Sequence, residues 1–106
     1  MPEKHYDKEV VTIDIDLEDL IPSFLKNRVD EVTAIRECVA ESDFKEAMRL
    51  GHGMKGAGAG YGFDEISEIG KVIEDASNQK NVPAIEAAVA RLARYLSVVE
   101  VVYEEG

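Results

Sequence analysis

The residues best suited to chemistry in this chain lie in one short run around His52. Lys55 follows the histidine by three residues and Gly56 by four, which places them close together on a helix surface. An unperturbed imidazole titrates near pH ~6.5, so much of it is neutral and nucleophilic at pH 7. Such a ring can attack phosphorus and form a phosphohistidine, with the Lys55 ammonium beside the phosphoryl oxygens. Because phosphoryl transfer depends mainly on positioning and charge neutralisation, the supporting metal and carboxylates can come from a partner.

The same run is unusually rich in glycine. Six of the eight glycines of the chain lie between positions 51 and 62. Each glycine in a helix interior costs about 1 kcal/mol relative to alanine, a cost that packing alone does not require. We therefore expect either a neighbouring helix or a partner protein to approach this helix closely. Gly56 in particular removes a side chain where a partner would otherwise collide.

Composition narrows the class of protein. A chain of 106 residues indicates one domain, and a net charge of -10 argues against binding to nucleic acid or anionic membranes. The single Cys38 has no internal disulfide partner, which favours a reducing compartment. The chain has no apolar run of about 18 residues, and its first nine residues are too polar for a secretory signal. We expect a cytoplasmic protein.

The periodicity of apolar residues predicts an all-α protein. Residues 1–16 are interpreted as an extended N-terminal tail, because residues 10–15 have β character but no evident partner strand. Residues 17–106 form the predicted domain. Short turns between long helices favour an up-down antiparallel four-helix bundle with a short extra N-terminal helix. Asp16 is expected to cap the short helix and Asp64 the third long one. The expected helices span 17–21, 22–40, 44–58, 64–77 and 83–103.

The helix expected at 44–58 has two distinct sides. At about 100° per residue, its core stripe comprises Phe44, Ala47, Met48, Gly51, Met54 and Gly58. His52 lies about a quarter turn from the centre of that stripe, at the boundary of the core. Its side is shared by Lys45, Arg49, Lys55 and Gly56. The histidine therefore has three cations around it on an otherwise acidic protein.

The pattern His52-x-x-Lys55-Gly56, followed by Gly62 and Phe63, resembles the signature of histidine-containing phosphotransfer (HPt) domains. Ile66, Ile69 and Glu74 also fit the third-helix pattern of that family, and the resemblance covers about residues 17–103. It implies that His52 accepts a phosphoryl group from a receiver-domain aspartate and passes it to another receiver. Lys55 would stabilise the phosphoryl group, Gly56 would give access and Gly62 would allow the turn that ends the helix.

The resemblance also implies the partners. These are receiver domains of a hybrid sensor histidine kinase and of a response regulator, which carry the Mg²⁺, so the chain itself needs no cofactor and no kinase activity. The expected partner surface comprises Lys45, Arg49, Gly53, Gly56 and Ala59. Its cations would complement the acidic pocket of a receiver. We expect a monomer, although the apolar residues Val98, Val99, Val101 and Val102 keep a dimer open.

The residue types and their spacing leave some alternative functions open and exclude others. A pure docking module, with His52 incidental, would use the same glycine-lined face. A phosphatase would need a water-positioning polar group that the residues near His52 do not plainly offer. His5 has no chemical context and is interpreted as a tail residue. Gly51-x-Gly53-x-x-Gly56 matches a dinucleotide fingerprint only in letters, because no strand precedes it. Two histidines and one cysteine, far apart, give no metal-ligand spacing.

Overall fold

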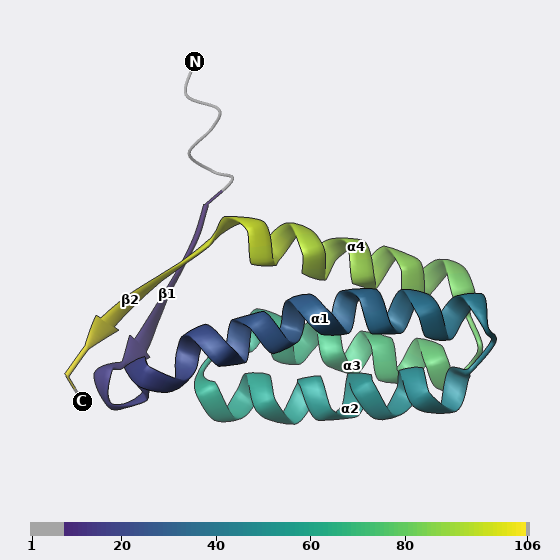
Figure 1. The fold of residues 1–106 in the computed structure, drawn as a ribbon, viewed down its shortest axis with the longest axis horizontal. Helices are drawn as coiled ribbons and strands as arrows, with labels where there is room; N and C mark the ends of the chain where they lie inside the picture. The colour runs from purple at the N-terminus through teal and green to yellow at the C-terminus, as the bar shows by residue number, and fades with distance from the viewer. Residues whose placement is uncertain (1–7, 106) are drawn as a thin grey trace, which may run out of the picture.

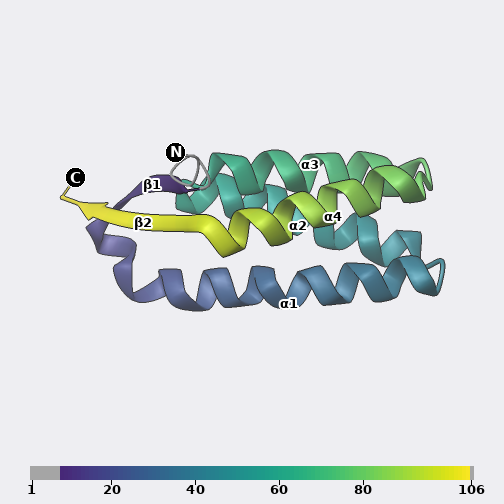
Figure 2. The ribbon, with the colours of Figure 1, turned by 90° about the horizontal axis from the view of Figure 1, so that it is seen from above.

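The computed structural model describes residues 8–105 and consists mainly of four long helices. Figures 1 and 2 show these helices side by side along the long axis of the molecule, with consecutive helices running in opposite directions. The helices are α1 (Ile21–Ala40), α2 (Phe44–Tyr61), α3 (Asp64–Asn78) and α4 (Val82–Val98). The predicted all-α four-helix bundle is therefore confirmed.

The turns between helices follow from local side-chain chemistry. The Asp43 carboxylate accepts a hydrogen bond from the Glu46 backbone N–H at 3.1 Å and caps α2. Asn81 caps α4 in the same way, accepting from the Ala84 N–H at 3.2 Å. Gly62 ends α2 in the left-handed conformation, with φ of 91°. These caps keep the connections short and hold neighbouring helices antiparallel.

Two helix boundaries differ from the sequence-based expectation. α2 was expected to end at residue 58 or a little beyond, at Gly60 and Gly62; it continues through Gly60 to Tyr61, and Gly62 alone ends it. Asp64 does not cap α3, because the N-cap residue is Phe63 and no side chain caps that end. The buried Phe63 side chain anchors the turn, and its carbonyl already accepts from the Ser67 N–H at 3.0 Å. The interior contact of the aromatic ring thus decides where the helix begins.

The largest difference between the expected and the observed secondary structure lies near the two ends of the chain. Residues 99–103, expected to be helical, lie in strand β2 (Val99–Glu104), and β1 (Glu9–Asp14) pairs with it in parallel. The described part of the expected tail therefore has a partner strand, with Glu9 opposite Val99 and Asp14 opposite Glu104. β-branched valines suit a strand better than a helix end. Periodicity within one segment cannot reveal a partner segment about ninety positions away.

A short 3₁₀ helix, η2 (Ile15–Leu20), joins β1 to α1. It replaces the short helix expected at 17–21. Its cap is Asp14 and not Asp16, since the Asp14 carboxylate accepts from the Asp16 N–H at 2.8 Å. Figure 1 shows the β1–β2 ribbon at the end of the bundle where α2 turns into α3.

The core is made by apolar side chains from all four helices and from β1. Its largest fully buried members include Ile13, Ile35, Met54, Phe63, Ile69 and Leu92. Val29 and Val72, which periodicity places inward, are instead 52% and 39% exposed. On α1 the inward position beside Val29 is taken by Arg28, whose guanidinium lies 4.7 Å from the centroid of the Phe24 ring.

Ile13 is the residue through which the ribbon contributes to the core, so its truncation should destabilise the whole domain. We expect Ile13→Ala to lower the free energy of unfolding by about 2–5 kcal/mol in urea denaturation. Val10→Ala, in the same strand but 62% exposed, should change it by no more than about 0.5 kcal/mol. Equal effects of the two substitutions would show that the ribbon does not pack on the bundle.

Candidate functional site

Three glycines bring α2 and α3 into direct backbone contact. A Cβ atom at Gly70 would lie 2.5 Å from the Lys55 backbone nitrogen, and one at Gly51 would lie 2.7 Å from the Glu74 nitrogen. A Cβ at Gly58 would lie 2.5 Å from the Ser67 nitrogen. No side chain larger than hydrogen fits at these positions without moving a helix. The close approach expected from Gly51 and Gly58 is thus present, with Gly70 as its counterpart on α3.

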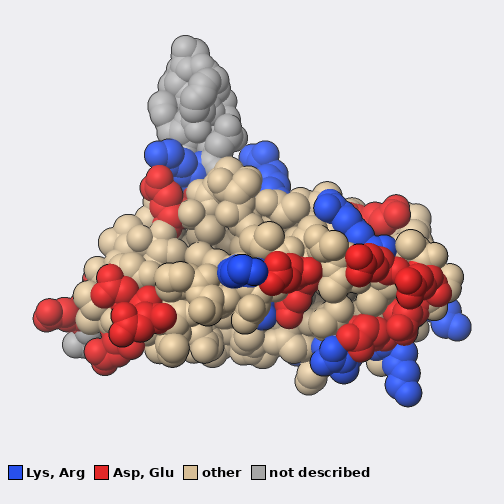
Figure 3. Space-filling model, viewed as in Figure 1, with Lys and Arg blue, Asp and Glu red and all other residues tan. Residues whose placement is uncertain are grey.

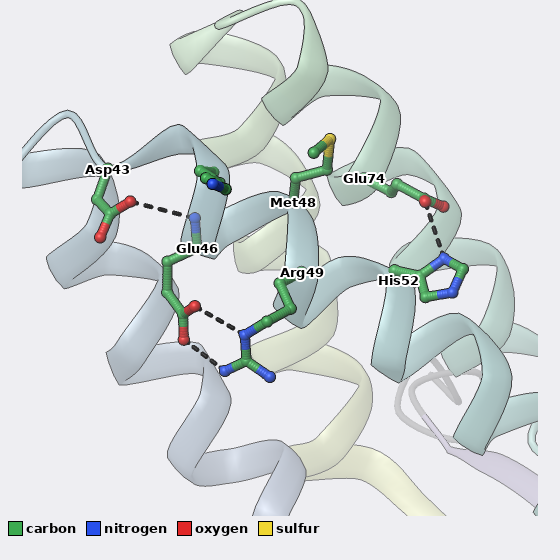
Figure 4. A pocket seen from close by; sticks show the side chains of 7 residues that line it. Asp43, Glu46, Met48, Arg49, His52 and Glu74 are labelled. Atoms are coloured by element: carbon green, nitrogen blue, oxygen red, sulfur yellow. Dashed lines mark hydrogen bonds and ion pairs between the residues drawn. The ribbon is translucent and has the colours of Figure 1, made fainter.

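This contact determines which side chains meet at the surface. His52 follows Gly51 on α2, and Glu74 lies one turn after Gly70 on α3. The Glu74 carboxylate bridges two residues of α2: its Oε2 lies 2.9 Å from His52 Nδ1, and its Oε1 lies 3.1 Å from Lys55 Nζ. The helix contact therefore assembles a histidine, a carboxylate and an ammonium into one cluster (Figure 4 shows the His52–Glu74 bond).

The geometry of the cluster favours one tautomer of the neutral imidazole. The hydrogen bond from Lys55, and to a smaller extent the one from His52, hold the pKa of Glu74 below its ordinary value. This carboxylate is therefore ionised at neutral pH. An ionised carboxylate only accepts hydrogen bonds, so His52 Nδ1 must carry the proton that it donates. In the neutral ring the lone pair then resides on Nε2. Because the His52 side chain is 67% exposed, this lone pair belongs to a ring that a partner can reach.

The cations around His52 are largely paired with carboxylates of the same chain. Arg49 donates to both oxygens of Glu46, from Nε at 2.7 Å and from a terminal nitrogen at 2.5 Å. This pairing lowers the pKa of Glu46. Lys55 is bound to Glu74, while Lys45 has no ion pair within residues 8–105. The positive surround expected from the sequence is therefore much weaker than a count of cations indicates.

A second set of glycines faces outward. Cβ atoms added at Gly53, Gly56 or Gly60 would have no heavy atom within 4 Å. These three positions and Ala59 are exposed on α2. The open space at Gly56 is what the access argument requires. The expected partner residues Lys45, Arg49, Gly53, Gly56 and Ala59 thus all lie on the exposed side of the helix that carries His52.

Glu74 is the residue of the cluster whose contact with His52 the sequence did not predict, since it was noted only as part of a third-helix pattern. Gly70 offered a signal. It is the one glycine inside the third helix, so it is the natural counterpart of Gly51, and Glu74 follows it by one turn. His5, interpreted as a tail residue, lies outside the described residues.

Comparison with protein families identifies the class. The Hpt domain family model matches residues 17–100, so the chain belongs to the Hpt domain family. Hpt domains are phosphocarrier modules, not kinases, and carry out histidine phosphotransfer in two-component signalling through the receiver domains of kinases and response regulators. No curated protein and no solved structure matched the chain. Strand β1 and all but the start of β2 lie outside the matched range.

Within residues 8–105, no group of three or more histidine, cysteine, aspartate or glutamate side chains is arranged to hold a metal ion. None of the helices in that range has the length and apolar character needed to cross a bilayer.

The α2–α3 contact predicts opposite effects for two glycine substitutions. Gly70→Ala should destabilise the domain by about 1–3 kcal/mol, because its Cβ would press on the backbone of α2. Gly53→Ala meets open space and removes a helix-interior glycine, so it should stabilise by about 1 kcal/mol. Urea unfolding followed by circular dichroism measures both. Stabilisation by Gly70→Ala would refute the contact.

The Glu74 hydrogen bond predicts the tautomer of His52. In the wild type, ring ¹⁵N chemical shifts should report a protonated Nδ1 and an unprotonated Nε2 in the neutral imidazole. Glu74→Ala should abolish this preference. Asp75→Ala, which removes the next carboxylate on α3 and only frees Lys71, should leave the tautomer unchanged. An identical tautomer in wild type and Glu74→Ala would remove the positioning role of Glu74.

Proposed function

We propose that this protein is the phosphotransfer intermediate of a multistep phosphorelay, with His52 as the phosphoacceptor. It would receive the phosphoryl group from the receiver domain of a hybrid sensor histidine kinase and pass it to a response regulator. The observation that carries the proposal is the His52–Glu74–Lys55 cluster. The Glu74 carboxylate binds Nδ1 of His52, which leaves Nε2 of this exposed ring as the nucleophile. A docking surface with an incidental histidine needs no such arrangement.

The chemical step follows from this geometry. The Nε2 lone pair attacks the phosphorus of a phosphoaspartate, the N–P bond forms, and the P–O bond to the aspartate breaks, so that a carboxylate leaves. The proton on Nδ1 stays in place, and the ionised Glu74 stabilises the positive charge that develops on the ring. Attack by the next receiver's aspartate on the phosphohistidine is the same step in reverse.

Lys55 and the partner supply the remaining electrostatics. The Lys55 ammonium lies on the same carboxylate as His52, so a small rotation of its flexible stem brings it to the phosphoryl oxygens. The Mg²⁺ that phosphoryl transfer requires would belong to the receiver, and this chain would bind no cofactor of its own. Gly56 leaves open space on α2 one turn after His52, where the receiver's backbone can approach.

Substitution of the two histidines tests the site directly. His52→Gln should abolish labelling from a ³²P-phosphorylated receiver domain, while His5→Gln, which removes the other histidine, should be labelled like the wild type. The label should be acid-labile and base-stable, as expected for a phosphohistidine. The exposed position of His52 predicts that His52→Gln melts cooperatively, within about 0.5 kcal/mol of the wild type.

The opposite outcomes are equally decisive. Labelling of His52→Gln at the wild-type rate would place the phosphoryl group elsewhere. Failure of the folded wild type to accept label from any receiver in a broad panel would favour the docking-module alternative, in which His52 has no chemical role.

A further inference from the structure

A hollow of about 540 Å³ adjoins His52 on the side toward the start of α2. Asp43 and Glu46 line one end, and His52 and Glu74 line the other. In Figure 4, Met48 and Arg49 lie between these two ends. The volume falls in the range of ligand-binding pockets, about 300–1,000 Å³. Nothing in the phosphotransfer chemistry itself requires this space.

The charges around the hollow argue against an anionic occupant. Arg49 is neutralised by Glu46, and His52 and Glu74 bind each other. Counted over the lining residues, three carboxylates face two permanent cations, Lys45 and Arg49. A free phosphate or an acidic side chain would thus enter a site with no excess positive charge. An uncharged group meets no such penalty.

Met48 gives the hollow its apolar character. It is the single apolar side chain among the lining residues, and it is half-buried. The long stems of Lys45 and Arg49 add further aliphatic surface, since their charged ends extend toward water or a partner carboxylate. Methionine is flexible and polarizable, so it adapts its shape to different apolar partners. A carrier that must bind two different receivers needs such adaptability.

The position of the hollow identifies what fills it. Any protein that delivers a phosphoryl group to Nε2 must cover His52, and the hollow shares His52 as a wall. On the other side of the histidine, the open positions Gly53, Gly56 and Gly60 let the partner's backbone come close to α2. A partner lying on this surface therefore has its side chains directly over the hollow.

We propose that the hollow seats an apolar side chain of the receiver domain, and that Met48 is a specificity-determining residue of the complex. The proposal rests on the phosphotransfer function of His52. Binding energy in protein interfaces concentrates in a few apolar side chains buried in pockets inside a polar rim. Most charges of the rim are already paired within the chain, as Glu46 is with Arg49 and Glu74 with Lys55, so docking over them leaves few charges to desolvate unpaired.

The test separates docking from chemistry with two phosphoryl donors. One is the receiver domain that phosphorylates the wild type fastest. The other is phosphoramidate, a small donor that needs no docking: Nε2 attacks its phosphorus, the P–N bond breaks and ammonia leaves. Met48→Ala should lower kcat/KM for the receiver about tenfold, mainly through a higher KM, and leave the phosphoramidate rate unchanged.

Two further variants control for folding and size. Leu50→Ala removes a half-buried side chain of similar size from the same helix, outside the hollow, and should leave the KM for the receiver unchanged. Met48→Gln keeps the length of the side chain but makes its end polar. It should raise the KM as Met48→Ala does, and it provides the same readout if the alanine variant does not fold.

Each remaining outcome overturns a defined part of the argument. If Met48→Ala and Met48→Gln slow the receiver reaction no more than Leu50→Ala, the hollow seats no partner side chain, although His52 keeps its function. If they slow the phosphoramidate reaction equally, Met48 acts on the histidine and not on a partner. If the wild type is labelled by neither donor, the proposed phosphotransfer function is refuted. The proposed binding of a receiver side chain in the hollow, which depends on that function, is then refuted as well.

Discussion

The backbone contact between α2 and α3 is the constraint on which the site depends. Gly51 and Gly70 allow the two helices to approach until main-chain atoms touch, and only at that distance does a carboxylate on α3 reach a histidine on α2. The same glycines weaken each helix in isolation, since helix-interior glycine is unfavourable. The contact between α2 and α3 offsets this cost in helix stability. The same contact therefore stabilises the fold and brings Glu74 to His52.

The protein has a net charge of -10, but the charged side chains near His52 are mostly paired with one another. Figure 3 shows acidic side chains gathered at both ends of the bundle on the face seen in Figure 1, with a small group of charged side chains of both signs at the middle and uncharged surface around it. The carboxylate bonded to the His52 ring, that of Glu74, also binds the Lys55 ammonium. His52 therefore has a nearly neutral surround, in which shape can contribute more to recognition than long-range attraction.

The sequence predicted those parts of the structure that depend on local pattern. Helix order and the position of His52 outside the core follow from periodicity, whereas the caps expected at Asp16 and Asp64 were both wrong. The role of Glu74 did not follow, because its meeting with His52 depends on how closely two helices pack. The ribbon was missed for a related reason: valines 99, 101 and 102 suit a strand, but a strand needs a partner that local pattern cannot supply.

The parallel ribbon has a consequence for the order in which the chain folds. It pairs Glu9 with Val99, so it closes a loop that contains nearly the whole protein. Contacts of such long sequence separation carry the largest loop-closure entropy and become favourable only after the intervening chain is compact. During synthesis β1 must wait, unpaired, until the residues of β2 have left the ribosome. We therefore expect the ribbon to form last, after the four helices have packed together.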